Sequence, residues 1–534
     1  MWYLIKFPEM YTTEIYKTPF WAENSGFMTG RDPLGIQNSS ITTYGRLLPG
    51  MTNLTLRLRY YGLYMWLLNE YDRLASKDST QRDQYNFVRR AELIVAFLMM
   101  KKFPSEQSII GSDYTSKKEK DGQYNQLGYY DIQLGADKNP NTVKGSVYWD
   151  FESGALGQYY AGSLIALGLI DISGKFFRLL DKGKKLATAL DKNITPTQKS
   201  RFLNLIQDGK LKLEDIDGIT DFALNNISPG SEEWTFYKDL LISEDGIDLT
   251  DKTGLVTQLR KNSLKLYLEY IQLEDDPVND QNFIKLQFQS NLTHTADDAS
   301  YGWHYYYVNE AFHIALETIF WSILVELEPR EKHLESLIRN TVEIITQEAE
   351  KSYLHGNSDK TLRELTHEFK SSNLVETLDE LERLVKSNHN ASVAIAKAFH
   401  VMMIIYAKYN DRLEELKNFE QKYKIWGQKG RVYDNIELYI QKHLDKNFDA
   451  FVKESIKMVL NDHVNTAYRK MGNGESNLLK FIIEDGLIFH IQTMTPRHTS
   501  PRLRALENFM RDLNFIDSNK RITDHGVALL EKFN

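Results

Sequence analysis

Helical periodicity between Tyr305 and Lys470 limits the possible folds of this chain more than any other feature. Apolar residues recur there at spacings of three and four positions, as they do on the buried face of an α-helix. The segment V-N-E-A-F-H-I-A-L-E-T-I-F-W-S-I-L-V-E-L is apolar on most of its faces and predicts a core helix. No repeat of fixed length is visible, so we expect a helical bundle or array and no regular solenoid.

Local composition divides the rest of the chain. Proline and glycine interrupt the first 50 residues, after which we expect a helix capped by Thr52 or Asn53 and a second helix over 84–102. Residues 104–150 are polar and rich in glycine and asparagine, which predicts a long loop or insertion. A chain of 534 residues is expected to form about two to four domains.

One pattern occurs twice. The stretch L-G-L-I-D-I-S-G-K-F-F-R-L-L-D-K-G-K-K-L begins at Leu167, and L-N-F-I-D-S-N-K-R-I-T-D-H-G-V-A-L-L begins at Leu513. The matched positions in the two copies are Leu167 and Leu513, Ile170 and Ile516, Asp171 and Asp517, Asp181 and Asp524, Gly183 and Gly526, and Leu186 and Leu529.

The pattern predicts a helix, a left-handed helix end, two short strands and a second helix. Gly168 or Asn514 suits the left-handed residue that ends the first helix. Asp181 in the first copy, and Thr523 or Asp524 in the second, can cap the helix that follows. This order resembles the wing of a winged-helix domain, and A-L-G-Q-Y-Y-A-G-S-L-I-A would then take the position of the recognition helix.

The sequence therefore predicts a mostly α-helical protein, a multi-helix scaffold with two winged-helix-like α+β modules. The expected segments are an irregular N-terminal part with one helix (1–80), a winged-helix-like module with an inserted loop (81–195), a mixed helical connector (196–300), a helical bundle (301–470) and a C-terminal winged-helix-like module (471–534).

Basic residues in both copies are candidates for nucleic-acid binding. A net charge of −8 argues against binding by bulk electrostatics, so any phosphate contacts must come from a local patch. Winged helices also mediate protein contacts, and both duplex DNA and a partner protein remain open as ligands. The candidate residues are Lys175, Arg178, Lys182, Lys184 and Lys185 in the first copy, and Arg497, Arg502, Arg504 and Arg521 near the second.

A third basic cluster contains Arg46, Arg57 and Arg59, with no acidic residue until Glu70. Arg57 and Arg59 are two positions apart, so on a helix they cannot serve one flat surface. Ion pairing and packing at a helix end explain this cluster at least as well as phosphate binding.

No complete catalytic motif is found in the sequence. The two E-x-x-H pairs, Glu310 with His313 and Glu364 with His367, have the spacing seen in di-iron helical bundles. The further glutamates of such a site cannot be identified, and phosphate-binding loops and nucleophile elbows are missing. We expect a non-catalytic protein with no metal site and no cofactor, and the alternative is a metal-dependent nuclease with a diverged site.

Composition restricts the cellular setting. The chain contains no cysteine, which excludes disulfides, thiolate nucleophiles and cysteine-bound zinc. Its first residues lack the features of a signal peptide. The most apolar later segment, 311–325, contains His313 and Glu317 and is too short to span a bilayer. These observations predict a cytoplasmic protein without membrane contact.

The segment from Arg31 to Leu68 reads R-D-P-L-G-I-Q-N-S-S-I-T-T-Y-G-R-L-L-P-G-M-T-N-L-T-L-R-L-R-Y-Y-G-L-Y-M-W-L-L. It resembles the N-terminal signature of a bacterial protein family encoded in multi-gene anti-phage defence islands, beside SMC-like, helicase or nuclease genes. The resemblance implies a subunit of a defence complex whose partners are an ATPase or a nuclease. A kleisin-like bridge of an SMC-type ATPase is a further alternative, and no catalytic residue is implied.

Overall fold

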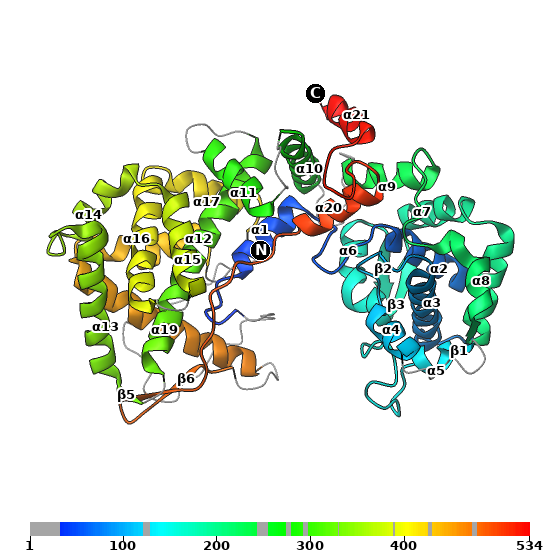
Figure 1. Cartoon of the computed structure of the whole chain (residues 1–534), viewed down its shortest axis with the longest axis horizontal. Helices are drawn as coiled ribbons and strands as arrows, with labels where there is room; N and C mark the ends of the chain where they lie inside the picture. Colours follow the sequence, from blue (N-terminus) through cyan, green and yellow to red (C-terminus); the bar gives the residue numbers. More distant parts are fainter. Residues whose placement is uncertain are drawn as a thin grey trace, which may run out of the picture. The chain divides into compact units, whose positions relative to one another are not determined.

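The protein is mostly helical, as the sequence predicts, and the strands of its described part form three small antiparallel sheets (Figure 1). The computed structural model describes residues 32–120, 129–242, 255–273, 279–291, 297–328, 331–387, 390–425, 430–472 and 478–533. Residues 1–31, including Arg31 and most of the predicted irregular segment, lie outside this description.

The chain forms two compact units, and each is discontinuous in sequence. Unit 1 contains the described residues of Met1–Tyr44, Ile284–Asp297 and Tyr301–Ser500, and unit 2 contains those of Gly45–Phe283, Asp298–Ser300 and Pro501–Asn534. The expected boundary at residue 300 therefore lies next to a boundary between the units. The stretch before Tyr44 groups with the helical bundle, and the C-terminal stretch groups with unit 2.

Unit 2 is built around a buried helix rich in aromatic residues. In α2 (Arg59–Leu74), the side chains of Tyr60, Tyr61, Tyr64 and Trp66 are fully buried. Helix α2 packs against α3 (Gln81–Lys102) and α7 (Asp181–Lys192), as Figure 1 shows. The remaining elements are α4 (Ser112–Lys120), β1 (Tyr129–Asp131), α5 (Ile132–Ala136), η1 (Leu156–Tyr160), α6 (Ala161–Ala166), β2 (Ile170–Ser173), β3 (Phe176–Leu179), α8 (Pro196–Asp208), β4 (Lys210–Lys212), η2 (Leu213–Phe222), α9 (Glu232–Ile242), α10 (Leu255–Leu273), α20 (Leu503–Asp512) and α21 (Asp524–Phe533).

Two N-terminal predictions are wrong. The stretch expected to be irregular contains α1 (Asn38–Leu47). The next helix begins at Arg59 with Leu58 as its N-cap, and it is not capped by Thr52 or Asn53. Residues 52–55 form a turn closed by a hydrogen bond from the Thr55 amide to the Thr52 carbonyl, and Leu54 is 54% exposed.

The second predicted helix is confirmed by α3, whose Thr80 and Asp83 form a capping box. The segment 104–150 is not simply a loop, because α4, β1 and α5 lie within it. Strand β1 pairs antiparallel with β4, more than 70 residues later in the chain, with Tyr130 opposite Leu211. Residues 121–128 lie outside the described part.

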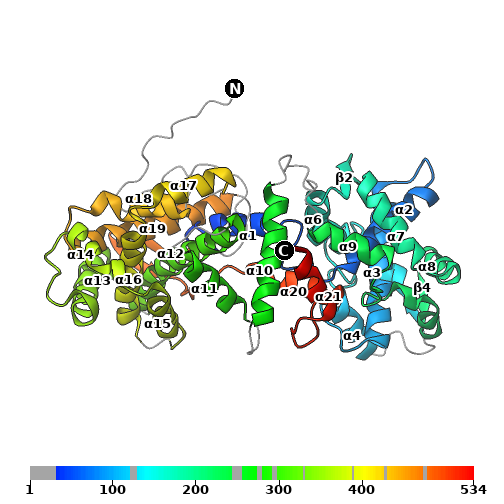
Figure 2. The same cartoon turned by 90° about the horizontal axis from the view of Figure 1, so that it is seen from above.

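Unit 1 confirms the helical stretch predicted from Tyr305 to Lys470. Helix α16 (Ala391–Tyr409) packs between α13 (Leu334–Ala349) and α15 (Leu374–Ser387), as Figure 2 shows. The other helices are η3 (Glu350–Leu354), α14 (Leu362–Glu368), η4 (Phe369–Ser371), α17 (Leu413–Lys422), α18 (Val432–Tyr439), η5 (Gln441–His443) and α19 (Phe448–Gly472). Two further helices, α11 (Asp280–Ser290) and α12 (Asp298–Leu327), contain residues of both units, as does α1.

Helix α12 is the predicted core helix. It has 30 residues, so the apolar segment within it belongs to a helix long enough to cross a bilayer, contrary to the sequence-based expectation. In the most apolar stretch of 18 residues within this helix, 94% of the residues are buried inside the protein. Among the described helices, α16 is also long and apolar enough to span a membrane, and 67% of its most apolar stretch of 18 residues is buried.

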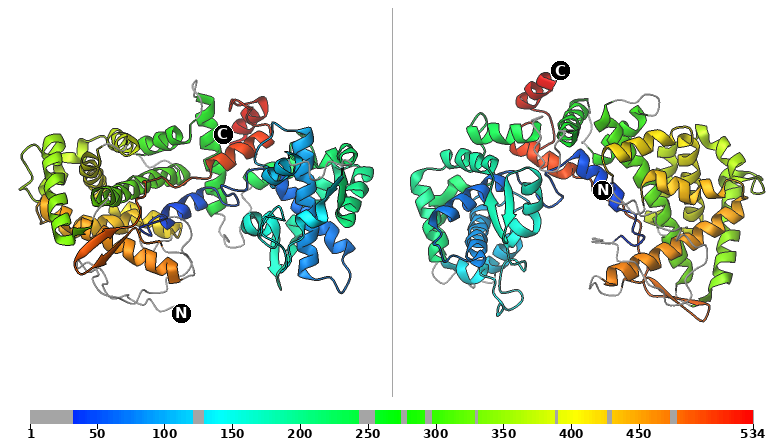
Figure 3. Two further views of the ribbon diagram at one scale, coloured as in Figure 1. Left: turned by 60° about the horizontal axis from the view of Figure 1, so that its bottom comes forward. Right: turned by 180° about the vertical axis from the view of Figure 1, so that it is seen from behind.

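A hairpin near the end of unit 1 turns at Asp485-Gly486. Strands β6 (Phe481–Glu484) and β7 (Leu487–His490) pair antiparallel, and β7 also pairs with β5 (Lys332–His333). Both turn residues have positive φ, 51° at Asp485 and 78° at Gly486, as a type I′ turn requires. Figure 3 shows this hairpin in orange.

Candidate functional sites

The two copies of the repeat share one backbone geometry. Gly168 has φ of 65° and Asn514 has φ of 58°, which confirms both predicted left-handed helix ends. Each end is a Schellman motif, in which the next residue, Leu169 or Phe515, donates its amide to the carbonyl five residues earlier, at 2.9 and 2.8 Å. The repeated sequence thus specifies a repeated structure.

A tight contact follows the helix end in each copy. Leu180 donates its amide to the Leu169 carbonyl, and Thr523 donates its amide to the Phe515 carbonyl, both at 3.0 Å. The glycine of the following helix packs against the same carbonyl, so a side chain cannot be accommodated at Gly183 or Gly526 without movement. This close approach explains why both copies carry glycine there.

The hairpins differ between the copies. In the first copy, β2 and β3 form four cross-strand pairs around Gly174 and Lys175, which both have positive φ. In the second copy, a single bridge joins Ile516 and Ile522. Within the described residues, β2 and β3 form a sheet of two strands only. Strand β1 pairs with β4 in a separate sheet. The shared structure is therefore a helix, a hairpin or bridge, and a helix.

Asp181 does not cap α7 as predicted. The N-cap is Leu180, and Asp181 is the first residue of the helix, where its negative charge lies near the positive end of the helix dipole. The helix before the hairpin is held by Glu92, which is fully buried on α3. Its carboxylate accepts hydrogen bonds from the amide of Leu156 at 3.0 Å and from the Tyr64 hydroxyl at 2.7 Å.

The predicted nucleic-acid residues of the first copy lie on β3, α7 and the turn before them. Lys175, Arg178, Lys184 and Lys185 are exposed, and Lys182 is half-buried. Acidic neighbours offset part of this charge, because Arg178 pairs with Asp72 at 3.1 Å and Lys184 with Asp181 at 3.6 Å. Lys175 and Lys185 form no ion pair with the described part of the chain.

The predicted residues near the second copy do not form one group. Arg497 belongs to unit 1, whereas Arg502, Arg504 and Arg521 belong to unit 2. Arg502 is half-buried and donates to the Leu48 carbonyl at 2.9 Å, while Arg504 and Arg521 are exposed. The structure therefore does not place Arg497 on the module to which the sequence assigned it.

Two residues of the third basic cluster form ion pairs, as the simpler interpretation predicts. Arg57 is buried and pairs with Glu106 at 2.6 Å and with Asp512 at 3.1 Å. Arg59 is also buried and pairs with Glu233 at 3.0 Å. These two arginines are therefore unavailable to phosphate groups.

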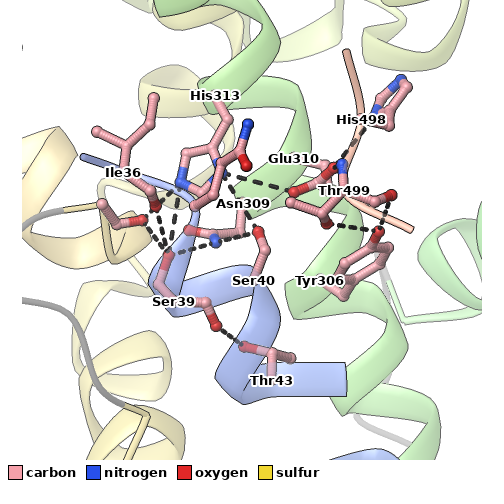
Figure 4. A network of polar contacts seen from close by, with 12 residues as sticks. Ile36, Ser39, Ser40, Thr43, Tyr306, Asn309, Glu310, His313, His498 and Thr499 are labelled. Carbon is pink, nitrogen blue, oxygen red and sulfur yellow. Dashed lines mark hydrogen bonds and ion pairs between the residues drawn. The ribbon is translucent and has the colours of Figure 1, made fainter. Parts of the chain in front are cut away.

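A buried polar network connects α1 with α12 in unit 1 (Figure 4). Asn309 donates from Nδ2 to the hydroxyls of Ser39 and Ser40, at 2.8 Å each. His313 lies one turn further along α12, with Nε2 2.8 Å from the Gly430 carbonyl oxygen. All four side chains are buried, so the network fixes α1 against the core helix.

The network continues through Glu310 to His498 and Glu382. His498 lies 3.3 Å from Glu310 through Nδ1 and 2.8 Å from Glu382 through Nε2. Burial opposes the charged imidazole, but hydrogen bonds to both carboxylates raise the pKa of His498 to about 10. His498 is thus an imidazolium that holds the segment after β7 against α12 and α15.

Neither E-x-x-H pair forms a metal site, and the described residues contain no cluster of three or more potential ligands. Glu310 and His313 belong to the network, and Glu364 completes a capping box with Thr361. Ser39, His313 and Glu310 have the residue types of a nucleophilic triad. The Ser39 hydroxyl, however, donates to the Gly430 carbonyl at 2.6 Å, and its distance to His313 Nε2 is 3.5 Å. This geometry is that of a structural network.

Unit 1 also contains a cavity of about 680 Å³ next to this network. Glu317 faces it from α12, one turn beyond His313, and accepts hydrogen bonds from Gln37 Nε2 at 2.9 Å and the Arg497 amide at 3.1 Å. The wall consists of Asp32, Pro33, Gln37, Glu317, His463, Thr466, Ala467, Lys470, Leu478, Lys480, Gln492, Thr493, Met494, Thr495, Arg497 and His498.

His463 lines this cavity as a neutral imidazole. It accepts the Lys480 amide at Nε2, at 2.9 Å, so Nδ1 carries the proton that it donates to the Pro33 carbonyl, also at 2.9 Å. Burial lowers the pKa of His463 to about 4, in agreement with this bonding. Sequence reasoning missed the cavity because its wall comes from separate segments without a common motif.

Comparison with protein-family models, curated proteins and solved structures gives no match to this chain.

Proposed function

We propose that this protein is a non-catalytic subunit of a bacterial defence complex against foreign DNA, and that it binds a partner protein through the first copy of the repeat. The resemblance of the segment 31–68 supports membership in such a complex, with an ATPase or nuclease as the partner. The first copy is the candidate docking module, because it has the more extended hairpin and a helix with an exposed face before it.

The exposed face of that helix carries the proposal. Residues 156–166, which span η1 and α6, include no charged side chain, and their exposed positions are Gln158 and Gly162. A helix that reads DNA uses basic and amide side chains for phosphates and base edges. This face has no basic side chain, and the glycine at one of its two exposed positions permits close packing of another protein.

Aromatic side chains extend this surface. Phe151 is 47% exposed, and Trp149 donates to Gln158 at 2.6 Å and packs edge-on against Tyr159. Aromatic residues are enriched in protein interfaces, where they supply much of the binding energy. The docking surface is therefore defined as Trp149, Phe151, Gln158, Tyr159 and Gly162.

Gly162→Arg tests this surface. Open space surrounds this position, since an added Cβ would have no neighbour within 4 Å, so the variant should fold. We expect co-expression with the products of the neighbouring genes to give a complex that Gly162→Arg disrupts. Asn204→Arg, on an exposed position of α8, is the matched control and should leave the complex intact. An intact complex with Gly162→Arg would contradict the assignment, and metal-dependent nicking by the pure protein would contradict the non-catalytic role.

Duplex DNA is the second candidate ligand, favoured by the exposed Lys175 and Lys185. Phosphate contacts would make the affinity fall steeply as salt concentration rises. Fluorescence anisotropy with a labelled duplex would then show a salt slope that Lys175→Glu with Lys185→Glu removes. Salt-independent binding, or the same slope in the double variant, would exclude these lysines as phosphate contacts.

A further inference from the structure

The cavity of unit 1 has the size and the charge of a small-molecule site. Its volume of about 680 Å³ falls within the range of ligand pockets in proteins, about 300–1,000 Å³. Four parts of unit 1 meet around it: the stretch before α1, helix α12, the end of α19, and the segments on either side of the β6–β7 hairpin.

The carboxylates of the wall are already satisfied by protein donors. Asp32 accepts the amides of Gly35 and Gln37, both at 2.8 Å, and is 4% exposed. Glu317 accepts Gln37 Nε2 and the Arg497 amide, and it is 2% exposed. These acids therefore have few lone pairs left to accept hydrogen bonds from cations that face the cavity.

Two lysines of the wall each donate to a neutral oxygen. Lys480 donates from Nζ to the Gln492 amide oxygen at 2.6 Å, and Lys470 donates from Nζ to the Asp32 carbonyl at 2.7 Å. Arg497 is exposed at the edge of the cavity, and within the described residues its guanidinium forms no ion pair. Lys480 and Arg497 thus line a space into which the two nearby carboxylates contribute few open acceptors.

We propose that this cavity binds a small molecule that carries a phosphate group, with Lys480 and Arg497 as its principal ligands. A guanidinium fork and a lysine point charge are the groups that proteins most often use for phosphate. The hydroxyls of Thr466, Thr493 and Thr495 line the same cavity and can donate further hydrogen bonds. The cavity does not overlap the docking surface of unit 2, so this site is independent of the proposed function.

Calorimetric titration of the full chain with inorganic phosphate, pyrophosphate and succinate tests the site. We expect one pyrophosphate per chain, weaker binding of phosphate, and no binding of succinate. Lys480→Gln and Arg497→Gln should each weaken pyrophosphate by about tenfold, since each removes one charge-assisted contact. Lys453→Gln, which changes an exposed lysine of α19 outside the cavity, is the matched control and should bind like the wild type.

Several outcomes would overturn the site. Absence of binding by both phosphate probes would exclude a phosphate ligand of this chemistry, and succinate binding as tight as pyrophosphate would indicate a general carboxylate site. Equal affinity in the wild type and in both glutamine variants would place the anion elsewhere. Circular dichroism of each variant separates loss of binding from loss of folding, and Arg497→Gln is the decisive variant because its side chain is exposed.

Discussion

Gly183 and Gly526 occupy equivalent positions in the two copies of the repeat, and a methyl group at either would lie 2.2 Å from a backbone carbonyl oxygen. The carbonyl is that of Leu169 in the first copy and that of Phe515 in the second. The same carbonyl accepts the amide that closes the hairpin or bridge, so it cannot move away without breaking this hydrogen bond.

We therefore expect Gly183→Ala and Gly526→Ala to destabilise the protein, by about 1–3 kcal/mol each, through overpacking. Gly162→Ala is the control, and it should stabilise the protein. Its Cβ would lie in open space, and alanine favours a helix over glycine by about 0.5–1 kcal/mol. Urea denaturation of the three variants measures these differences. Unchanged stability in both Gly183→Ala and Gly526→Ala would contradict the close approach.

We predict that Arg59 contributes far more to the stability of the fold than to the binding of any ligand. Its partner Glu233 is fully buried, so Arg59→Met would leave an uncompensated charge in the core and cost about 3–5 kcal/mol. Arg178→Met, which removes an exposed ion pair with Asp72, is expected to cost less than about 1 kcal/mol. Denaturation midpoints distinguish these values, and partial recovery in Arg59→Met with Glu233→Leu would assign the loss to the unpaired carboxylate.

The sequence predicts best those elements that local rules determine. Helix α3, the helices of unit 1 and the two left-handed helix ends follow from apolar spacing, caps and glycine or asparagine at the correct position. The repeat was detectable for the same reason, since each anchor residue has a local role. The pairing of β1 with β4 joins segments that are distant in the sequence, and no local pattern encodes it.

Helix α1 was missed because most of its buried residues are small and polar. Ser39, Ser40 and Thr43 are fully buried, and Thr43 bonds back to the Ser39 carbonyl at 2.8 Å. Tyr44 and Leu47 are its buried hydrophobic residues, and two such positions give too weak an apolar periodicity to reveal the helix. The cavity and the network were missed likewise, because Asp32, Glu317 and His498 are brought together only by the tertiary fold.

His498 should make stability depend on pH in the alkaline range. Its pKa is raised in the folded protein from an ordinary value of 6.5 to about 10, so its stabilising effect is complete below pH 6.5 and lost as the pH rises towards 10. His498→Gln should cost about 3 kcal/mol at pH 6, because Glu310 and Glu382 lose their cation. The difference between wild type and variant, from urea denaturation at pH 6, 8 and 9.5, should shrink with rising pH, and a constant difference would contradict a charged His498.

Glu317 should also make the stability fall as the pH rises, but at lower pH and because its charged form destabilises the folded protein. Burial raises its pKa from 4.5 to about 7, although the Arg497 amide opposes the shift, so the folded protein holds this proton more tightly than the unfolded chain. The wild type therefore loses stability as the pH rises from 4.5 to 7, and the cost persists above pH 7. Glu317→Gln removes this cost, and the Gln37 amide can turn to accept from the new side chain.

We expect Glu317→Gln to be more stable than the wild type at pH 8, by about 2 kcal/mol, and equal to it at pH 4.5. Thermal and urea denaturation at the two pH values measure the change, and Glu328→Gln, at an exposed position just after α12, is the matched control. A variant less stable than the wild type at pH 8 would show that the carboxylate is needed in its charged form, as the acceptor that joins α1 to the segment after β7 through Gln37 and Arg497.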